Sequence, residues 1–131
     1  MIARSSPTPS VAIGDVLAGH LAVRAALSQA GKLDLWSDDA LHACASVGGG
    51  RPVSARVVGD GWWLLGTVSL PLGLRHCERV LVWATTDTGP ATFLVDLPDG
   101  PRTEHRRSGT VELEIDALVG SERLVIQVLN A

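Results

Sequence analysis

The chain has little of several features that would settle its class at once. Its 131 residues include only two cysteines, Cys44 and Cys77, too few for the disulfide framework of a small secreted domain. The formal net charge is −3, which removes the electrostatic attraction that nucleic-acid binding needs. No apolar run is long enough to span a bilayer, and the first ten residues, MIARSSPTPS, lack the apolar stretch of a signal peptide. These absences predict a cytoplasmic protein with reduced, buried thiols and with neither nucleic acid nor membrane as a partner.

Apolar side chains, by contrast, are abundant. Hydrophobic residues make up 46% of the sequence, and the mean hydropathy of +0.24 is high for a protein in water. A chain of this length is expected to be one domain that buries roughly two-thirds of its unfolded surface. The composition therefore predicts either a well-filled core or an apolar face that a partner covers.

The first 47 residues are predicted to be mostly helical. Residues 1–10 are interpreted as a disordered lead-in, because Ser, Pro and Thr cannot build a core. Residues 11–47 form the predicted N-terminal helical segment, with a helix from Ile13 to Ala30 that Gly31 ends. The predicted buried face of this helix consists of Val16, Val23, Leu27 and Ala30, widened by Leu17 and Leu21.

The same helix has a polar row, and a second helix is predicted after it. His20, Arg24 and Ser28 follow one another at a spacing of four residues, so they are predicted to face water. A short second helix is predicted to begin at Ser37. Serine is a favoured N-cap, and the two aspartates that follow it place negative charge at the positive end of a helix dipole.

Residues 48–131 are predicted to form a β domain, because the apolar period changes from 3.6 to two after the glycine run at 48–50. Turns rich in Gly, Asp and Pro separate short alternating stretches. No helix-length segment intervenes, which argues against a parallel βαβ sheet. The predicted fold is therefore mainly β: an antiparallel barrel or sandwich preceded by one or two helices. Its strands are predicted at residues 53–57, 62–69, 79–86, 91–97, 111–116 and 124–129.

Four motifs in this part resemble the middle domain of acyl-CoA dehydrogenases. They are GDGWWLLGT at residues 59–67, CERVLVWA at 77–84, FLVD at 93–96 and DALVGSERLV at 116–125. Their order and spacing match the family, and the preceding helix is similar to the last helices of the family's N-terminal domain. The resemblance covers about residues 16–125 and is firm from Ala55 onward. It implies a middle-domain β fold, an oxidoreductase acting on CH–CH bonds, and FAD as the cofactor.

The positions that would contact the flavin depart from the family pattern. The family's Thr/Ser-Glu-Pro loop falls at residues 45–50, where Ser46 matches the hydroxyl residue and the Glu-Pro pair is absent. The aromatic residue that packs on the flavin ring falls at Leu70, and the hydroxyl near flavin N5 falls at Leu72. Ser46, Leu70 and Leu72 are thus the candidate cofactor-binding positions. Leucine supplies neither a stacking ring nor a hydroxyl, which argues against FAD.

No catalytic residue and no metal site are predicted. A flavin dehydrogenase needs a base to remove a proton, but Glu112 and Glu114 fit the solvent face of a strand better than a catalytic site. The histidines and cysteines match no standard zinc spacing. The glycines at 48–50 are interpreted as a flexible connection rather than a phosphate loop, and HRR at 105–107 as a solvated loop.

Two hypotheses from different classes remain open. The chain ends at Ala131, where the resemblance places the start of the family's C-terminal helical domain and its catalytic carboxylate. The first hypothesis is a truncated or degenerate component of a flavin-dependent CH–CH oxidoreductase assembly. Such a component would not be active alone and would need a protein partner or a homo-oligomer. A purely structural interaction subunit is a third interpretation.

The alternative is a stand-alone β-barrel that binds a small apolar molecule in the former flavin cleft, as a binding module or as a cyclase or isomerase. The ligand would be an acyl-CoA or another apolar small molecule. Trp62 and Trp63 are neighbours on one strand, so only one of them can point inward. The predicted pocket is lined by Val68, Leu70, Leu72 and Trp63.

Overall fold

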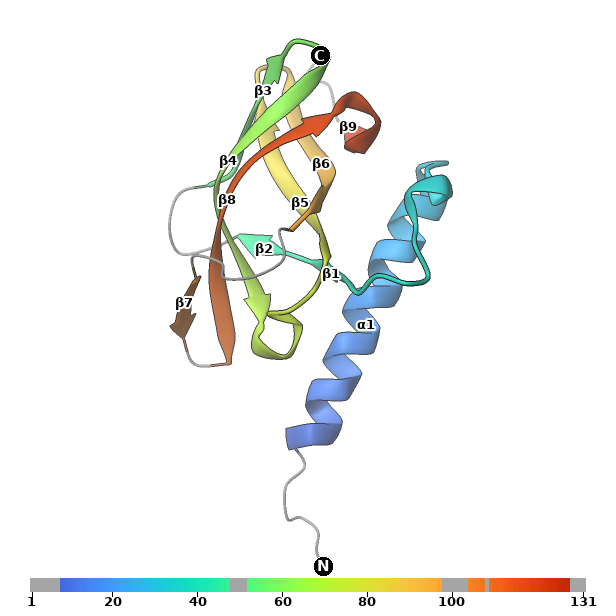
Figure 1. The fold of residues 1–131 in the computed structure, drawn as a ribbon, viewed down its shortest axis with the longest axis vertical. Helices are drawn as coiled ribbons and strands as arrows, with labels where there is room; N and C mark the ends of the chain where they lie inside the picture. The colour runs from blue at the N-terminus through green and yellow to red at the C-terminus, as the bar shows by residue number, and fades with distance from the viewer. Residues whose placement is uncertain (1–7, 48–51, 98–103, 108, 128–131) are drawn as a thin grey trace, which may run out of the picture.

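The computed structural model describes residues 8–47, 52–97, 104–107 and 109–127. One long helix, α1 (Thr8–Gln29), lies along one side of a strongly bent β-sheet (Figure 1). The chain is mainly β, as the sequence predicts. Among the described residues, no helix is long and apolar enough to cross a membrane.

Helix α1 ends where the sequence predicts. Gly31 adopts φ of +71°, a left-handed conformation that costs glycine little. Its N–H donates to the Ser28 carbonyl at 3.1 Å, and the Lys32 N–H donates to the Leu27 carbonyl at 2.8 Å. This pair of hydrogen bonds is the Schellman pattern, which satisfies carbonyls that the helix end would otherwise leave unpaired. At its other end the helix begins at Thr8, within the segment predicted as a lead-in; residues 1–7 lie outside the described part.

The second helix predicted at Ser37 is not formed. A single 3-10 turn, η1 (Leu33–Leu35), lies just before Ser37, and residues 36–41 form turns and extended chain. The Ser37 hydroxyl does accept a hydrogen bond from the Asp39 N–H at 3.3 Å, but it closes a local turn instead of capping a helix. Serine favours both arrangements, so its presence alone does not distinguish them.

The described residues form nine strands of one sheet, in the order β7-β8-β4-β3-β5-β6-β9, with β1 added to β5 and β2 added to β4. The predicted strands are all present, with bounds shifted by a few residues. The sequence does not predict the strands β1, β2 and β7 or two further 3-10 turns. The strands are β1 (His42–Cys44), β2 (Ser46–Val47), β3 (Ser54–Val58), β4 (Gly61–Pro71), β5 (Arg79–Thr86), β6 (Gly89–Asp96), β7 (Glu104–Arg107), β8 (Thr110–Gly120) and β9 (Leu124–Gln127), and the turns are η2 (Leu72–Leu74) and η3 (Ser121–Arg123).

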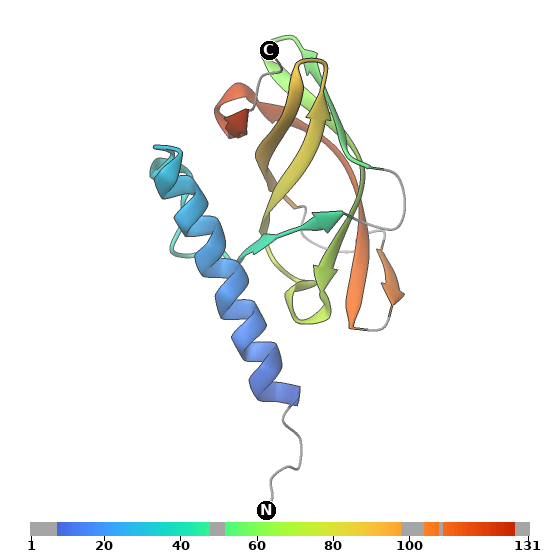
Figure 2. The ribbon, with the colours of Figure 1, turned by 180° about the vertical axis from the view of Figure 1, so that it is seen from behind.

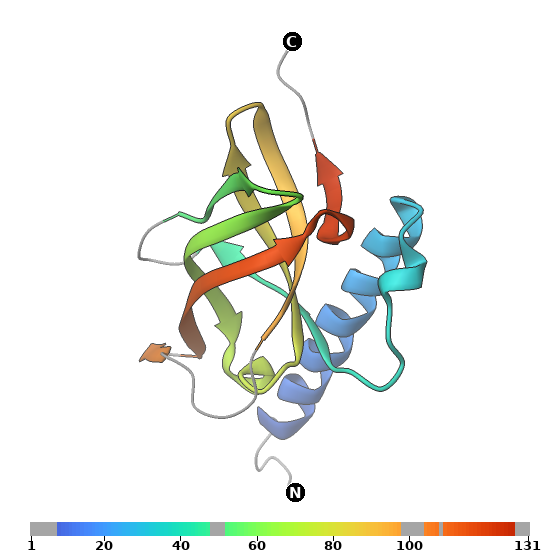
Figure 3. The same ribbon diagram turned by 45° about the horizontal axis from the view of Figure 1, so that its top comes forward.

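The sheet differs from the predicted antiparallel barrel in two respects. It is mixed, because β1 and β3 both pair with β5 in parallel. It is also not closed: β7 and β9 end the path of described strands and do not pair with each other, although the sheet curves around its interior (Figure 3). A period of two shows which residues share a face, but it carries no information on which strand lies beside which.

Two apolar clusters hold the layers together. The main core fills the concave side of the sheet and includes Leu64, Leu70 and Phe93, all fully buried. The second core lies between the helix and the sheet, where Val23 and Leu27 pack near Leu94 and Val125 (Figure 2). The helix is therefore fixed to the outside of the curved sheet by its C-terminal half.

Val23 and Leu27 are buried, and Arg24 and Ser28 are exposed, as predicted, but both predicted helix faces are wrong in part. Leu17 and Leu21, expected to widen the buried face, are 55% and 50% exposed. His20, expected to face water, is half-buried and turns toward the chain that leads into β1. The helix is apolar on several sides, so the sequence pattern alone cannot say which side meets the sheet. The side chain of Val16 lies outside the described part.

On the sheet, the assignment of Trp62 and Trp63 to opposite faces is confirmed. Trp62 packs against the main core, with its ring 5.3 Å from that of Phe93. Trp63 points outward, and its indole N–H donates to Asp116 Oδ1 at 2.7 Å. The prediction for Glu112 is wrong, because this residue is buried where β7 pairs alongside β8, whereas Glu114 is exposed.

Candidate functional site

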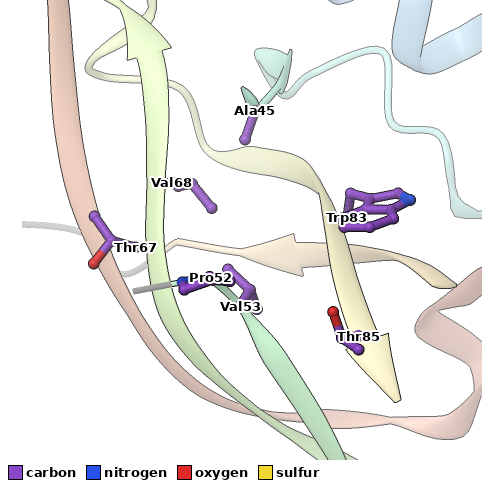
Figure 4. Close-up of a pocket in the computed structure, with 7 residues that line it drawn as sticks. All are labelled: Ala45, Pro52, Val53, Thr67, Val68, Trp83 and Thr85. Carbon is purple, nitrogen blue, oxygen red and sulfur yellow. The ribbon is translucent and has the colours of Figure 1, made fainter. Parts of the chain in front are cut away.

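A hollow of about 340 Å³ opens between β4 and β5, and Figure 4 shows its side chains arranged around one space. The described part of the lining is largely apolar, with two threonine hydroxyls and no charged side chain. The residues that line it are Ala45, Pro52, Val53, Thr67, Val68, Trp83 and Thr85.

The hollow forms because strand pairing is interrupted at this point. Along one edge of β4, strand β3 pairs with residues up to Leu65, and strand β2 pairs from Val68 onward. Gly66 and Thr67, which lie between these two stretches, therefore have no described strand partner on this edge. Along the facing edge of β5, strand β1 pairs with residues up to Leu81, and strand β3 pairs only with Thr85. The described strands thus leave a gap in the sheet between β4 and β5.

Backbone groups of Trp83 face this gap. Leu81 accepts a hydrogen bond on this side from the Ala45 N–H at 3.0 Å, and Thr85 donates one to the Val53 carbonyl at 3.0 Å. Alternate residues of a strand direct their N–H and C=O groups to the same edge. Trp83 lies between these two residues, so its own N–H and C=O point into the gap.

Gly66 allows the chain to approach closely beside the hollow. Its φ is +156°, and a Cβ atom at this position would stand 2.5 Å from the Pro52 carbonyl oxygen and 2.5 Å from the Val53 Cα. Both contacts are with backbone atoms, which cannot turn aside as a flexible side chain can. A residue with a side chain would therefore push the segment before β3 away from β4.

The predicted site residues do not form a single pocket. Val68 lines the hollow between β4 and β5. Leu70 is fully buried in the main core, and Leu72 is 36% exposed at the start of η2. Trp63 lines a smaller hollow of about 160 Å³ on the outer face. Ser46 pairs with Ser69 through β2, but its side chain lies outside the described part.

Sequence reasoning missed the other residues of the larger hollow. Trp83 is one of four tryptophans that the sequence alone does not distinguish, and the threonines Thr67 and Thr85 carry no motif that marks a site. The hollow results from where three short strands stop, and the sequence contains no signal for that. The glycines at 48–50, interpreted as a flexible connection, lie outside the described part. Residues 105–107, interpreted as a solvated loop, belong instead to strand β7, and their side chains lie outside the described part.

The described residues do not fit FAD. Leu70, which the sequence resemblance aligns with the stacking aromatic, has no exposed surface with which to meet a ring. Leu72 is exposed but offers no hydrogen-bonding group. Among the described residues, the lining of the hollow between β4 and β5 has no arginine or lysine to face a pyrophosphate. No cofactor chemistry can therefore be derived from this chain alone.

A second cluster of chemically interesting side chains lies where α1 meets β1. The rings of Trp36 and His42 are stacked, 4.1 Å apart with an interplanar angle of 14°, and His20 lies 4.6 Å from Trp36. The His42 backbone N–H donates to His20 Nδ1 at 3.3 Å. His42 is fully buried, and neither of its ring nitrogens has a hydrogen-bond partner among the described residues.

Burial lowers the pKa of His42 below its ordinary value of 6.5, and the neighbouring His20 and Arg79 lower the pKa further. Glu78 and the Ala40 backbone oppose this shift. The neutral imidazole is therefore the form that suits the folded protein.

The two cysteines are free thiols, and Cys77 is fully buried. Burial also raises the pKa of the Cys44 thiol, which favours its neutral form. Within the described ranges, no group of three His, Cys, Asp or Glu side chains is arranged to hold a metal ion.

At the level of sequence, no protein-family model and no curated protein matches the chain. Its structure does resemble solved structures. A chain of the ChsE4–ChsE5 complex from Mycobacterium tuberculosis superposes with a TM-score of 0.68 at 27% identity over 82% of this chain. A glutaryl-CoA dehydrogenase from Mycobacterium smegmatis, in complex with FADH2, superposes with a TM-score of 0.61 at 19% identity over 82%. The resemblance to acyl-CoA dehydrogenases is confirmed.

A protein from Mycobacterium smegmatis identified as an acyl-CoA dehydrogenase also superposes on this acyl-CoA dehydrogenase-like chain. Its TM-score is 0.61, at 19% identity over 76% of the chain. In each of the three comparisons the chain spans 34% of the length of the other protein. It therefore reproduces about one third of a dehydrogenase-type chain.

Proposed function

We propose that this chain is a component of a flavin-dependent acyl-CoA dehydrogenase-type assembly in the cytoplasm and is not active on its own. A protein partner would supply the remaining helices, the catalytic base and most of the FAD site. The observation that carries this proposal is the dehydrogenase-type fold of the chain combined with an apolar face of α1, at Leu17 and Leu21, that the sheet leaves exposed.

The uncovered face of α1 supports a partner. Only two of its 22 residues are charged, Asp15 and Arg24, so the helix is apolar on nearly all sides. Helices of this composition are normally buried on all sides within a larger protein. Here Val23 and Leu27 meet the sheet, while Leu17 and Leu21 are at least half exposed. The helical domain of a dehydrogenase-type partner would bury that second face.

The substituted flavin positions support the loss of independent activity. With leucine at 70 and 72, the chain supplies no stacking ring and no hydroxyl toward a flavin. If the assembly contains FAD, the partner's residues must hold it. An acyl-CoA substrate would bind mainly to the partner for the same reason.

The proposal is tested by co-expressing the chain with its neighbouring genes and measuring the intact mass of the purified complex. We expect a stable complex with a helix-rich, dehydrogenase-type chain, and flavin only in that complex. A chain that stays alone with every neighbour, or that oxidises an acyl-CoA unaided, would refute the proposal.

Charge substitutions locate the interface. The double variant Leu17→Glu/Leu21→Glu changes only exposed side chains, so we expect the chain to fold but its affinity for the partner to fall at least about 100-fold, because charges at an apolar contact are strongly unfavourable. Leu118→Glu is the matched control, since Leu118 is 73% exposed on β8, away from the helix. Equal loss of complex in both variants would contradict the assignment of the interface to α1.

A further inference from the structure

We propose that the hollow between β4 and β5 binds a neutral, flat, largely apolar molecule that carries a hydrogen-bond donor next to an acceptor. The proposal concerns a ligand site of this chain itself. It does not depend on the partner or on the dehydrogenase role.

The lining decides the charge of the ligand. Among the described residues, the lining has no acidic or basic side chain, so a charged group placed against them would lose its hydration without gaining a partner. Its volume of about 340 Å³ lies at the lower end of the range of small-molecule pockets. A neutral molecule of two or three fused rings suits both properties.

The backbone edge of Trp83, which no described strand pairs on this side, decides the polar pattern. Its N–H and C=O point into the gap, flanked by the hydrogen bonds of Leu81 and Thr85 to neighbouring segments. A ligand with an acceptor beside a donor can pair with these two groups as an added strand would. Thr67 and Thr85 also line the hollow, and their hydroxyls offer further contacts.

The Trp83 indole favours a flat ligand. The side chain is 52% exposed although it lies on a strand whose neighbours Val82 and Ala84 are fully buried. Exposed aromatic faces of this kind stack well on flat rings. Figure 4 shows the indole at the side of the hollow next to β5, across from Thr67 on β4.

Three probes with the same double ring test the proposal by calorimetric titration of the full chain. Carbostyril is a neutral two-ring lactam with an N–H beside a C=O, naphthalene lacks polar groups, and naphthoate carries a negative charge. We expect carbostyril to bind one-to-one, naphthalene to bind about tenfold more weakly because two hydrogen bonds are lost, and naphthoate not to bind. No saturable carbostyril binding, or equal binding of naphthoate, would overturn the proposal.

Matched variants locate the probe. Trp83→Ala should weaken carbostyril binding about tenfold, while Trp63→Ala, at the other outward-facing tryptophan, should leave it within about twofold. Ala45→Leu keeps the indole and fills the hollow, so it should abolish binding even if Trp83→Ala does not fold; thermal unfolding of each variant checks folding. An equal loss in Trp63→Ala, or full binding by Ala45→Leu, would overturn the assignment.

Discussion

His42 has an environment that its side chain does not favour. A neutral imidazole carries one donor and one acceptor, and leaving both unpaired in a buried site costs on the order of 1–3 kcal/mol. Stacking on Trp36 and full burial of the ring offset part of this cost. The residue therefore stabilises the contact between α1 and β1 only as long as it stays neutral.

Stability should fall in acid because of this residue. The pKa of His42 is lowered in the folded state, so the unfolded chain binds a proton more readily. Above pH 6.5, His42 therefore does not lower the free energy of unfolding. As the pH falls from 6.5 to the lowered pKa of His42, the free energy of unfolding decreases by up to about 1.4 kcal/mol per pH unit.

Substitution of His42 separates its effect from that of other groups. His42→Phe keeps a ring for stacking on Trp36 and has no nitrogen to protonate. We expect it to flatten the pH dependence of the unfolding free energy below pH 6.5, measured by chemical denaturation. His76→Gln, at an exposed histidine, should leave the wild-type slope in place. An unchanged slope in His42→Phe would contradict the role of His42.

Single residues also show the limits of sequence reasoning. The motifs FLVD and DALVGSERLV lie apart in the sequence, yet they meet in the structure: Arg123 donates to both carboxylate oxygens of Asp96, at 2.8 and 3.0 Å, and Arg79 binds the same carboxylate at 3.0 Å. The motif pattern records which residues are present. It does not record that β6 and the turn before β9 lie side by side.

At the scale of elements, Gly66 on β4 tests how the gap in the sheet is built. Gly66→Ala would place a Cβ atom 2.5 Å from two backbone atoms of the segment before β3. We expect it to lower the free energy of unfolding by about 2 kcal/mol or more, measured by chemical denaturation.

Gly59→Ala is the control for this prediction. Gly59 also has a positive φ, +58°, but a Cβ atom added there would have no other atom within 4 Å, so only the conformational cost of about 1 kcal/mol is expected. If the two variants lose the same stability, close packing at Gly66 is not what shapes the hollow.

The strands could be predicted from the sequence where their apolar and polar residues alternate. β5 matches its predicted bounds of 79–86, and β4 and β8 extend beyond theirs, because each buries one face over its length. β1, β2 and β7 have two to four residues each, too few to show a period of two. Of these short strands, β1 and β2 border the hollow and β7 covers Glu112. The strands that shape the candidate site are therefore the ones that the sequence does not predict.

At the scale of the whole molecule, fold and chemistry separate. The motifs that carry strand structure keep the dehydrogenase pattern, and the structure confirms the fold they imply. The two positions that the resemblance aligns with flavin contacts are leucines, and one of them, Leu70, is enclosed in the core. The fold is thus confirmed, whereas the loss of a flavin site stays a prediction.

The central claim is that this scaffold holds no flavin by itself. The most direct test is the visible absorbance spectrum of the purified full chain after incubation with FAD and removal of free cofactor. We predict a colourless protein with no flavin band, since neither leucine position nor the hollow beside Trp83 can hold the cofactor. A yellow protein that retains one FAD per chain, and whose flavin band bleaches when an acyl-CoA is added, would contradict the account.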